Sequence, residues 1–591
     1  MKKTFIYTTI WLILAMIVPL GASAYDFQVG NIYYKINGEG TVSVTYKDTN
    51  LNSYSGTVTI PATVSNNGVT YTVTEIGSSA FRASSGLVRV NLPSTMQTIG
   101  YASFYNCRAL AYINIPNSVT YIDSFAFRQC TSLTEITIPG SIPYMGGQVF
   151  QGCTGLRQVT IQEGLTGLSA ATFYQCSALE SIVIPSTVTD IYMMCFADCT
   201  SLTDVTIPST TTYIDSSAFD NTPWLNNQPD GVVYAGCIAY MYKGTMPAGT
   251  TITLRNGTVT MGTRLFDSQD GLVGLNIPAS LAHIDASCVI DCQNLVSIKV
   301  ASGNTTFDSR NNCNAIIETA TNTLILGCNA SQVPSSVTAI GTTAFTYCNG
   351  LSSTMLNDNI TSIGDYAYSY CSGITRVEIP ASLTSIGRGA FAGCTNATSV
   401  TVNSGNPVYD SRQGCNAIIE TATNTLIAGF SKSFIPEGIT AIGDYAFYWQ
   451  YLLSSITIPA SVTRIGDMAF YYMNNLETIV CEATTPPSIS SAAFENNAIL
   501  YATLYVPRAS LETYQNTDVW NWIHSIRAIE DLVNGDVDGD GKVGISDVTA
   551  LIDYILNNDS RELNLYNADC DKNRKVDIAD VSEVIDMLLG N

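Results

Sequence analysis

The chain has 591 residues and a formal net charge of −22, yet only 13% of its residues are charged. Its length exceeds that of one ordinary domain, which favours several domains or a repeat array. The acidic excess argues against a nucleic-acid partner, because phosphates bind basic surfaces. With only two histidines, His283 and His524, the chain is poorly supplied for Ser-His-Asp, Cys-His or zinc catalysis.

Residues 1–24 have the pattern of a secretory signal peptide. The basic start Lys2-Lys3 precedes an apolar run from Phe5 to Leu20, and residues 22–24 (Ala-Ser-Ala) form a small-x-small cleavage site. An uncleaved membrane anchor is the alternative interpretation, because the apolar run is long. No later stretch reaches the roughly 18 continuous apolar residues of a spanning helix. We therefore expect a protein that is secreted or held at the cell surface, with no membrane span after cleavage.

The next segment, residues 25–73, is predicted to be a β-rich N-terminal cap. The dipeptides Asn37-Gly38 and Asn67-Gly68 are typical of tight hairpin turns between short strands.

From residue 74 to 495 the sequence repeats itself with a 23-residue period, which is the signature of a solenoid. Three columns share the period: Phe81, Phe104, Phe127, Phe150, Phe173, Phe196, Phe219; Leu87, Leu110, Leu133, Leu156, Leu179, Leu202; and Cys107, Cys130, Cys153, Cys176, Cys199. In the unit that starts at Ser118, Leu133-x-x-Ile136-x-Ile138 has the alternation of a short strand, and Pro139 ends it. No coil can bury these residues alone, so neighbouring coils must stack.

The seventeen cysteines would suggest disulfides in an exported protein, but their spacing favours another role. A cysteine at a fixed repeat position is expected to be a small buried side chain in a column. A bridge between the isolated pair Cys288 and Cys292 stays open.

Three insertions interrupt the period, near residues 231–244, 307–327 and 409–429. FDSRNNCNAIIETATNTLILG begins at Phe307, and the related YDSRQGCNAIIETATNTLIAG begins at Tyr409. Each has two short apolar strands around a turn and is predicted to be a hairpin that protrudes from the coil. Residues 496–530 depart from the period and contain Trp520 and Trp522; we expect a C-terminal cap there, because solenoid ends need covering.

The unit IG-x-x-AF-x-x-C-x-x-L-x-x-I-x-IP, seen at Ile386-Gly387, Ala390-Phe391 and Cys394, resembles the BspA-like class of leucine-rich repeats (LRR type 5) over about 450 residues. The resemblance implies a bacterial secreted or surface protein, of a class that includes adhesins. It is informative for the fold and uninformative for the ligand, because the matching residues are core residues.

A duplicated acidic motif follows in residues 531–591, where 14 acidic and 5 basic residues give a net charge of −9. In the first copy, oxygen ligands fall at positions 1, 3, 5, 7 and 12 of an EF-hand-like loop, with Gly541 at the turn position 6: Asp536, Asp538, Asp540, the Lys542 carbonyl and Asp547. The second copy supplies Asp569, Asp571, Asn573, the Lys575 carbonyl, Asp577 and Asp580. We therefore predict two Ca²⁺ ions, with a lower affinity in the second loop because Arg574 replaces glycine at position 6.

Each loop is followed by an amphipathic helix, and the paired units make a small all-α module. With aspartate at position 12 of both loops, the tail resembles a type I dockerin. The resemblance implies calcium-dependent binding to a cohesin module, read by positions 10 and 11 of each loop: Ile545, Ser546, Ile578 and Ala579. It also implies an association with polysaccharide-degrading complexes.

No catalytic signature accompanies these modules. The best aromatic cluster is open to two interpretations, ligand stacking or packing between coils: Tyr366, Tyr370, Tyr445, Tyr448, Trp449, Tyr451, Tyr471, Tyr472. We expect a non-catalytic interaction protein whose solenoid recognises a protein or glycan and whose module tethers it. The alternative is a component of a polysaccharide-degrading complex with a glycoside hydrolase role, for which two carboxylates would suffice.

Overall fold

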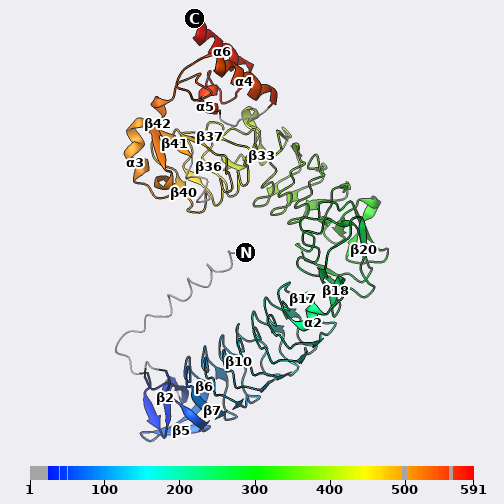
Figure 1. The fold of residues 1–591 in the computed structure, drawn as a ribbon, viewed down its shortest axis with the longest axis vertical. Helices are drawn as coiled ribbons and strands as arrows, with labels where there is room; N and C mark the ends of the chain where they lie inside the picture. Colours follow the sequence, from blue (N-terminus) through cyan, green and yellow to red (C-terminus); the bar gives the residue numbers. More distant parts are fainter. Residues whose placement is uncertain are drawn as a thin grey trace. The chain divides into compact units, whose positions relative to one another are not determined.

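The computed structural model describes residues 24–38, 40–48, 51–285, 287–494, 502–557 and 563–590. Of the predicted signal peptide, only Ala24 lies within these residues. The chain divides into two compact units, Met1–Gly244 with Val259–Leu265, and Thr245–Thr258 with Phe266–Asn591. In both units the chain winds in successive stacked coils (Figure 1). Among the described residues, every helix is too short or too polar to cross a membrane.

The first unit begins with a hairpin sheet that continues directly into the coils. Strands β1, β2 and β3 pair antiparallel, β5 lies antiparallel to β6, and β3, β6, β8 and β10 then follow in parallel order. The side chains of Tyr34 and Val42 are buried against the first coil, so the end of the core is covered. The strands are β1 (Phe27–Val29), β2 (Ile32–Gly38), β3 (Thr41–Thr45), β5 (Thr63–Asn66), β6 (Val69–Ile76), β8 (Thr98–Ile99) and β10 (Tyr121–Ile122).

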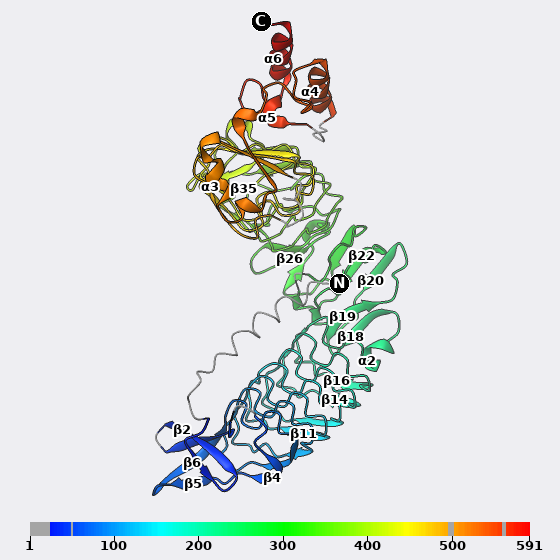
Figure 2. The same cartoon turned by 60° about the vertical axis from the view of Figure 1, so that its left-hand side comes forward.

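In the first unit, one wall of the coils is formed by short strands, each paired in parallel with its equivalent in a neighbouring coil. Glu135 lies beside Gln158 and Ile136 beside Val159, so equivalent positions of consecutive repeats are in register. Within the strand Ile136 is buried and Glu135 exposed, as the alternation predicts. These strands are β4 (Ser55–Thr59), β7 (Gly86–Asn91), β9 (Tyr112–Ile113), β11 (Glu135–Ile138), β12 (Gln158–Ile161), β14 (Ser181–Val183) and β16 (Asp204–Thr206). Figure 2 labels β4, β11, β14 and β16 in succession.

The remaining walls hold two-residue strands and turns. The two-residue strands beyond β10 are β13 (Gly167–Leu168), β15 (Asp190–Ile191) and β17 (Tyr213–Ile214). The turns pair through backbone bonds between coils: the Phe104 amide donates to the Ala126 carbonyl at 2.7 Å, and the Asn106 amide to the Arg128 carbonyl at 2.8 Å. Asn106 has a φ of 63°, a left-handed conformation that is costly for most residues. Bonds to the next coil stabilise it.

The phenylalanine and cysteine columns fill the interior. Consecutive rings from Phe81 to Phe219 are stacked, with centroids 4.8–5.4 Å apart. In the column from Cys107 to Cys199, each repeat cysteine donates through its thiol to a phenylalanine carbonyl of a neighbouring coil, as Cys130 does to Phe104 at 3.2 Å. All 17 cysteines fall within the described residues; all are buried, and none of them is in a disulfide here. Cys288 and Cys292 lie as separate thiols in this structure.

The first unit ends with a helical turn and a hairpin. Thr222 caps helix α2 by accepting from the Leu225 amide at 3.2 Å, and Pro223 occupies its first position. The degenerate insertion forms an antiparallel hairpin whose second strand pairs parallel with the next coil. The elements are α2 (Pro223–Asn226), β18 (Gly231–Ala235), β19 (Ile238–Lys243) and β21 (Thr260–Met261).

The second unit resumes the coils and contains the two related insertions. Its parallel strands up to the second insertion are β20 (Thr250–Thr253), β22 (Leu272–Ile277), β23 (His283–Ile284), β24 (Ser297–Val300), β28 (Ala339–Ile340), β29 (Ser362–Ile363), β30 (Arg376–Ile379), β31 (Ser385–Ile386) and β32 (Ser399–Val402). The first insertion consists of β25 (Phe307–Asp308), η1 (Arg310–Asn312), β26 (Ile316–Glu318) and β27 (Thr323–Leu326). The second consists of β33 (Tyr409–Asp410), η2 (Arg412–Gly414), β34 (Ile418–Glu420) and β35 (Thr425–Ala428).

These hairpins are built into the solenoid and do not simply protrude from it. Strand β27 pairs antiparallel with β26 on one side and parallel with β28 on the other, placing Leu324 beside Ile340. The Leu324 side chain is fully buried, so the hairpin supplies a rung of the core. A projecting hairpin would leave its apolar residues in water, which explains the difference from the sequence-based expectation.

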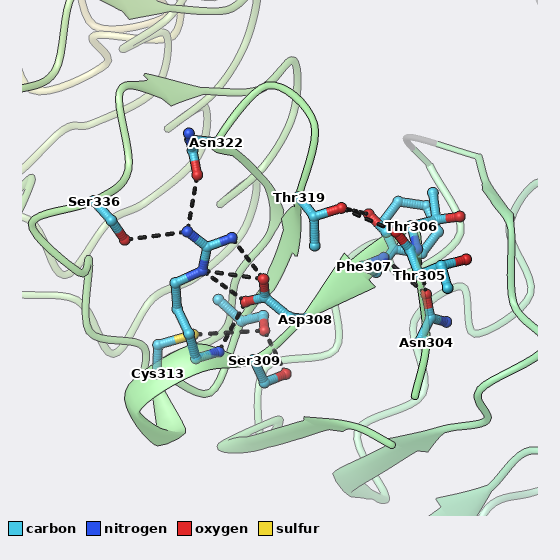
Figure 3. A network of polar contacts seen from close by, with 12 residues as sticks. Asn304, Thr305, Thr306, Phe307, Asp308, Ser309, Cys313, Thr319, Asn322 and Ser336 are labelled. Atoms are coloured by element: carbon cyan, nitrogen blue, oxygen red, sulfur yellow. Dashed lines mark hydrogen bonds and ion pairs between the residues drawn. The ribbon is translucent and has the colours of Figure 1, made fainter. Parts of the chain in front are cut away.

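An arginine fork closes each insertion. In the first, Arg310 donates through Nε to Asp308 Oδ1 at 2.8 Å and through Nη1 to Asn322 Oδ1 at 2.8 Å and Ser336 Oγ at 3.3 Å. Figure 3 shows Asp308, Asn322 and Ser336 gathered in this network. In the second, Arg412 bonds in the same way to Asp410 and Asn424. The network ties the start of the insertion to its turn.

The last coils are closed by aromatic residues. Trp520 is fully buried and its Nε1 donates to the Pro487 carbonyl at 2.9 Å, whereas Trp522 is exposed. The strands are β36 (Ala441–Ile442), β37 (Ser455–Ile458), β38 (Arg464–Ile465), β39 (Thr478–Cys481), β40 (Ser488–Ile489), β41 (Thr503–Val506) and β42 (Ser525–Ala528). The helical segments are η3 (Arg508–Ser510), α3 (Leu511–Gln515), η4 (Trp520–Trp522) and η5 (Ile529–Asp531).

Where the structure describes the C-terminal module, its helices are α4 (Ile545–Asn557), α5 (Leu565–Ala568) and α6 (Ile578–Leu589). Its apolar core is small, with six buried residues: Val537, Leu551, Ala568, Cys570, Val581 and Val584.

Candidate metal centre

Two clusters of carboxylates lie at the start of the two loop–helix units. Asp536, Asp538 and Asp540 bring their oxygens within 4.8 Å of one another in the first loop. Asp569, Asp571 and Asp580 do the same in the second loop. The structure therefore assembles most of the predicted carboxylate ligands into two groups with the hard oxygen donors that Ca²⁺ prefers.

The first ligand position of each loop has an unsatisfied oxygen. Asp536 Oδ1 and Asp569 Oδ1 are buried and accept no hydrogen bond from any described residue. Burial is the main cause that raises the pKa of Asp569 to about 6, and burial together with the neighbouring aspartates raises the pKa of Asp536. A buried carboxylate oxygen without a donor is costly unless a cation neutralises it. The residues present thus fit a divalent cation.

Position 12 of each loop also organises the backbone. Asp547 Oδ1 accepts from the amides of Val537 at 2.6 Å and Asp538 at 3.0 Å. Asp580 accepts equivalent bonds from Cys570 and Asp571, at 2.7 and 3.3 Å. Asp580 still lies within its carboxylate cluster, whereas the cluster of the first loop does not include Asp547. In this structure, Asp547 holds the loop closed through amides.

The remaining predicted ligands serve the loop turns. The Lys542 amide donates to Asp540 Oδ1 at 2.8 Å, and the Lys575 amide donates to Asn573 Oδ1 at 2.8 Å. Asp577 caps helix α6, where its carboxylate accepts from the Ala579 amide at 2.8 Å. The bonds of Asp540 and Asn573 are equivalent in the two loops, whereas the cap from Asp577 has no counterpart, because the first loop has Gly544 at that position.

Two asparagines that the sequence analysis overlooked join the loops to each other. Asn567 Nδ2 donates to the Asp536 carbonyl at 2.8 Å, and Asn534 Nδ2 donates to the Cys570 carbonyl at 3.1 Å. Each asparagine therefore reaches from one repeat into the loop of the other. The two occupy equivalent positions of the duplicated motif, two residues before the first ligand of each loop, so the duplication itself could have identified them.

Position 6 shows how the second loop accommodates a side chain. Gly541 has a φ of 86° and Arg574 a φ of 68°, and both amides donate to the position-1 aspartate, at 3.1 and 3.0 Å. The turn is therefore the same in both loops. An arginine in this left-handed conformation carries a cost that glycine avoids.

The residues at positions 10 and 11 point away from the loops into solvent. Ile545 and Ile578 are 79% and 68% exposed, and Ser546 and Ala579 are exposed beside them. Ile545 and Ile578 each begin a helix. Because their apolar side chains are so exposed to water, they are available to a partner surface.

The rings of the aromatic cluster in the second unit pack mainly against one another. Tyr366 meets Tyr445 edge to face at 5.5 Å, and Trp449 meets Tyr370 at 5.5 Å and Tyr472 at 4.3 Å. These rings belong to different coils. The contacts favour the second interpretation in the sequence analysis, stabilisation between coils.

Protein-family models match both parts of the chain. A model of the BspA type leucine rich repeat region matches in six copies, over residues 62–166, 133–229, 240–324, 326–423 and 427–517. A model of the dockerin type I domain matches residues 534–589. No curated protein matches the chain.

Several solved structures are similar. A leucine-rich repeat protein from Bacteroides ovatus is 24% identical over 64% of this chain and 95% of its own, with a TM-score of 0.32. A leucine rich cell surface protein from Faecalibacterium prausnitzii is 22% identical over 80% of this chain and 96% of its own, with a TM-score of 0.27. A leucine rich repeat protein of T. pallidum is 26% identical over 31% of this chain and 81% of its own, with a TM-score of 0.28. These TM-scores are low, and the family identification rests on the family models.

Proposed function

We propose that this chain, which belongs to the BspA-type leucine-rich-repeat family and ends in a type I dockerin domain, is a non-catalytic interaction protein outside the cell. In this proposal the dockerin holds two Ca²⁺ ions and tethers the chain to a cohesin module, and the solenoid recognises a protein or glycan. The duplicated carboxylate clusters beside two exposed isoleucines are the observation that carries it.

The chemistry of the ion sites supports a structural role for calcium. When bound, each ion would neutralise a carboxylate cluster and satisfy the free oxygen of Asp536 or Asp569. The chain's own residues do the rest: Asp547 and Asp580 hold the loop amides, and Asn534 and Asn567 join the two loops. The ordered loops thereby hold the starts of the two helices, and with them the exposed residues Ile545 and Ile578, in fixed positions.

The tether is tested with the mature protein and a panel of purified cohesin modules in calcium. We expect at least one module to bind the wild type and to lose affinity for the double variant Ile545→Asp with Ile578→Asp. Both residues are highly exposed, so folding should be unaffected. Val183, an apolar residue of the solenoid that is 65% exposed, offers the matched control Val183→Asp. Loss of binding by this control, or no binding by the wild type to any module, would contradict the cohesin proposal.

The solenoid and the hydrolase alternative are tested together. The mature protein is incubated with a panel of polysaccharides and with extracellular matrix proteins, and both retention and reducing-end release are measured. We expect retention by one ligand without release of reducing ends. Turnover that a single Asp or Glu substitution abolishes would instead establish the glycoside hydrolase role.

A further inference from the structure

Arg574 makes a contact that calcium binding does not require. Its guanidinium Nη2 donates to Glu482 Oε2 at 2.7 Å and also to Glu437 Oε1. Both glutamates belong to the last coils of the solenoid, Glu482 directly after strand β39. The arginine side chain is only 14% exposed. A loop of the C-terminal module is therefore paired with the solenoid through one cation and two carboxylates.

The residue type at this position is informative. The loop uses only the backbone of position 6, because the Arg574 amide bonds Asp569 just as the Gly541 amide bonds Asp536. An arginine there adopts a left-handed backbone conformation that favours glycine, so the residue type carries a cost within the loop. The side chain must contribute something outside the loop, and its partners in the structure are the two glutamates.

The contact extends beyond the ion pairs. Helix α5 lies against strand β37. A cavity of about 310 Å³ lies between them, lined from the solenoid by Phe434 and Leu453 and from the module by Tyr554 and Tyr566. Interfaces typically have an apolar core surrounded by a polar rim. The apolar side chains at the cavity and the ion pairs beside it have this composition.

We propose that the module docks on the last coils of its own chain, with Arg574 as the anchor and Glu437 and Glu482 as its receptors. The docking goes beyond the proposed function and does not depend on cohesin binding. It leaves Ile545 and Ile578 exposed, so the outward helix ends stay accessible. The module would then be held against the last coils and set their orientation relative to a bound partner, whereas a flexible linker would let them move freely.

The test uses the full mature chain in calcium and measures how well the interface tyrosines are protected from hydroxyl-radical labelling. Arg574→Gly gives the second loop the residue of the first, so calcium binding should survive, which a calorimetric titration checks. We expect this variant to lose protection of Tyr554 and Tyr566. The double variant Glu437→Gln with Glu482→Gln, which leaves the module untouched, should show the same loss. Glu477→Gln, an exposed carboxylate of the same stretch of coils, is the matched control and should label as wild type does.

A variant that combines Arg574→Gly with Glu482→Gln shows whether the two substitutions act through the same ion pair. Adding Glu482→Gln to Arg574→Gly should cause no further loss of protection, because the pair is already broken. Labelling of the tyrosines that stays at the wild-type level in both the Arg574 and the glutamate variants would overturn the docking. So would losses that add independently, or an equal loss in the Glu477 control. A chain that fails to bind cohesin but shows the expected pattern would refute the tether and leave the docking intact.

Discussion

Single residues in the interior of the solenoid act through their neighbours in the next coils. Phe127 is fully buried, with its ring stacked 5.1 Å from Phe104 and 5.3 Å from Phe150. Phe127→Ala should destabilise the local coils by about 3–5 kcal/mol, because it leaves a cavity between two rings. Since coils contact only their neighbours, the damage should remain local.

Hydrogen exchange followed by mass spectrometry measures this effect. We expect faster exchange in the coils around residues 100–150 and wild-type exchange in the coils of the second unit. Val183→Asp, on the solvent side of a strand, is the control. Uniform loss of protection along the whole chain would contradict nearest-neighbour stacking.

The two position-1 aspartates of the module allow the calcium loops to be compared. We expect Asp536→Ala to weaken calcium binding more than Asp569→Ala does, because Arg574 at the turn position already lowers the calcium affinity of the second loop. A calcium titration of each variant by calorimetry gives the affinities. Asp553→Ala, an exposed carboxylate of helix α4 outside both loops, should leave them unchanged. A larger effect of Asp569→Ala would show that the second loop is the stronger site.

At the scale of elements, each hairpin insertion is held by its arginine fork. Burial raises the pKa of Asp308, but the hydrogen bonds and the charge of Arg310 outweigh it, so the pKa falls below its ordinary value. Asp308→Asn should destabilise the first hairpin by about 1–2 kcal/mol, because the charged guanidinium of Arg310 then faces a neutral amide in place of a carboxylate. Local hydrogen exchange over residues 307–327 measures the loss, and the second hairpin, with Asp410 intact, serves as the control within the same molecule.

The same ion pair predicts a pH dependence. Because the folded-state pKa of Asp308 lies below its unfolded value of about 3.9, the pair contributes its full stability above that pH. The contribution is lost as the pH falls through the lower, folded-state pKa. In the Asp308→Asn variant this part of the pH dependence should be absent. Identical acid sensitivity of the first hairpin in variant and wild type would contradict the assignment.

At the scale of the whole molecule, calcium should stabilise the module and leave the solenoid unchanged. Without a cation the clustered carboxylates repel one another, and the six-residue core of the module offers little apolar burial to compensate. We expect a chelator to remove helical circular dichroism from residues 531–591 and calcium to restore it. Residues 25–530 should melt at the same temperature in both conditions. If the helical signal of residues 531–591 is the same with and without calcium, the metal assignment is refuted.

The sequence alone was sufficient for the repeating and the duplicated features. The periodic columns predicted the stacked coils and the buried phenylalanines, because a solenoid repeats one local solution and its core residues recur at a fixed spacing. The duplicated acidic motif predicted the two carboxylate clusters, because their residues are neighbours in sequence. The cysteine column was expected to be buried, and its thiols donate to carbonyls of neighbouring coils.

Only the tertiary structure decided the contacts between residues that share no period. The pairing of β27 with β28 makes the insertion part of the sheet, and no local pattern encodes that choice of partner. The structure also shows that Asp547 accepts from loop amides, a contact that the spacing of the motif alone does not indicate. From the sequence, Arg574 was noted only as an arginine at a turn position where glycine is expected. Glu437 and Glu482 lie 137 and 92 residues from it, and only folding brings such distant charges together.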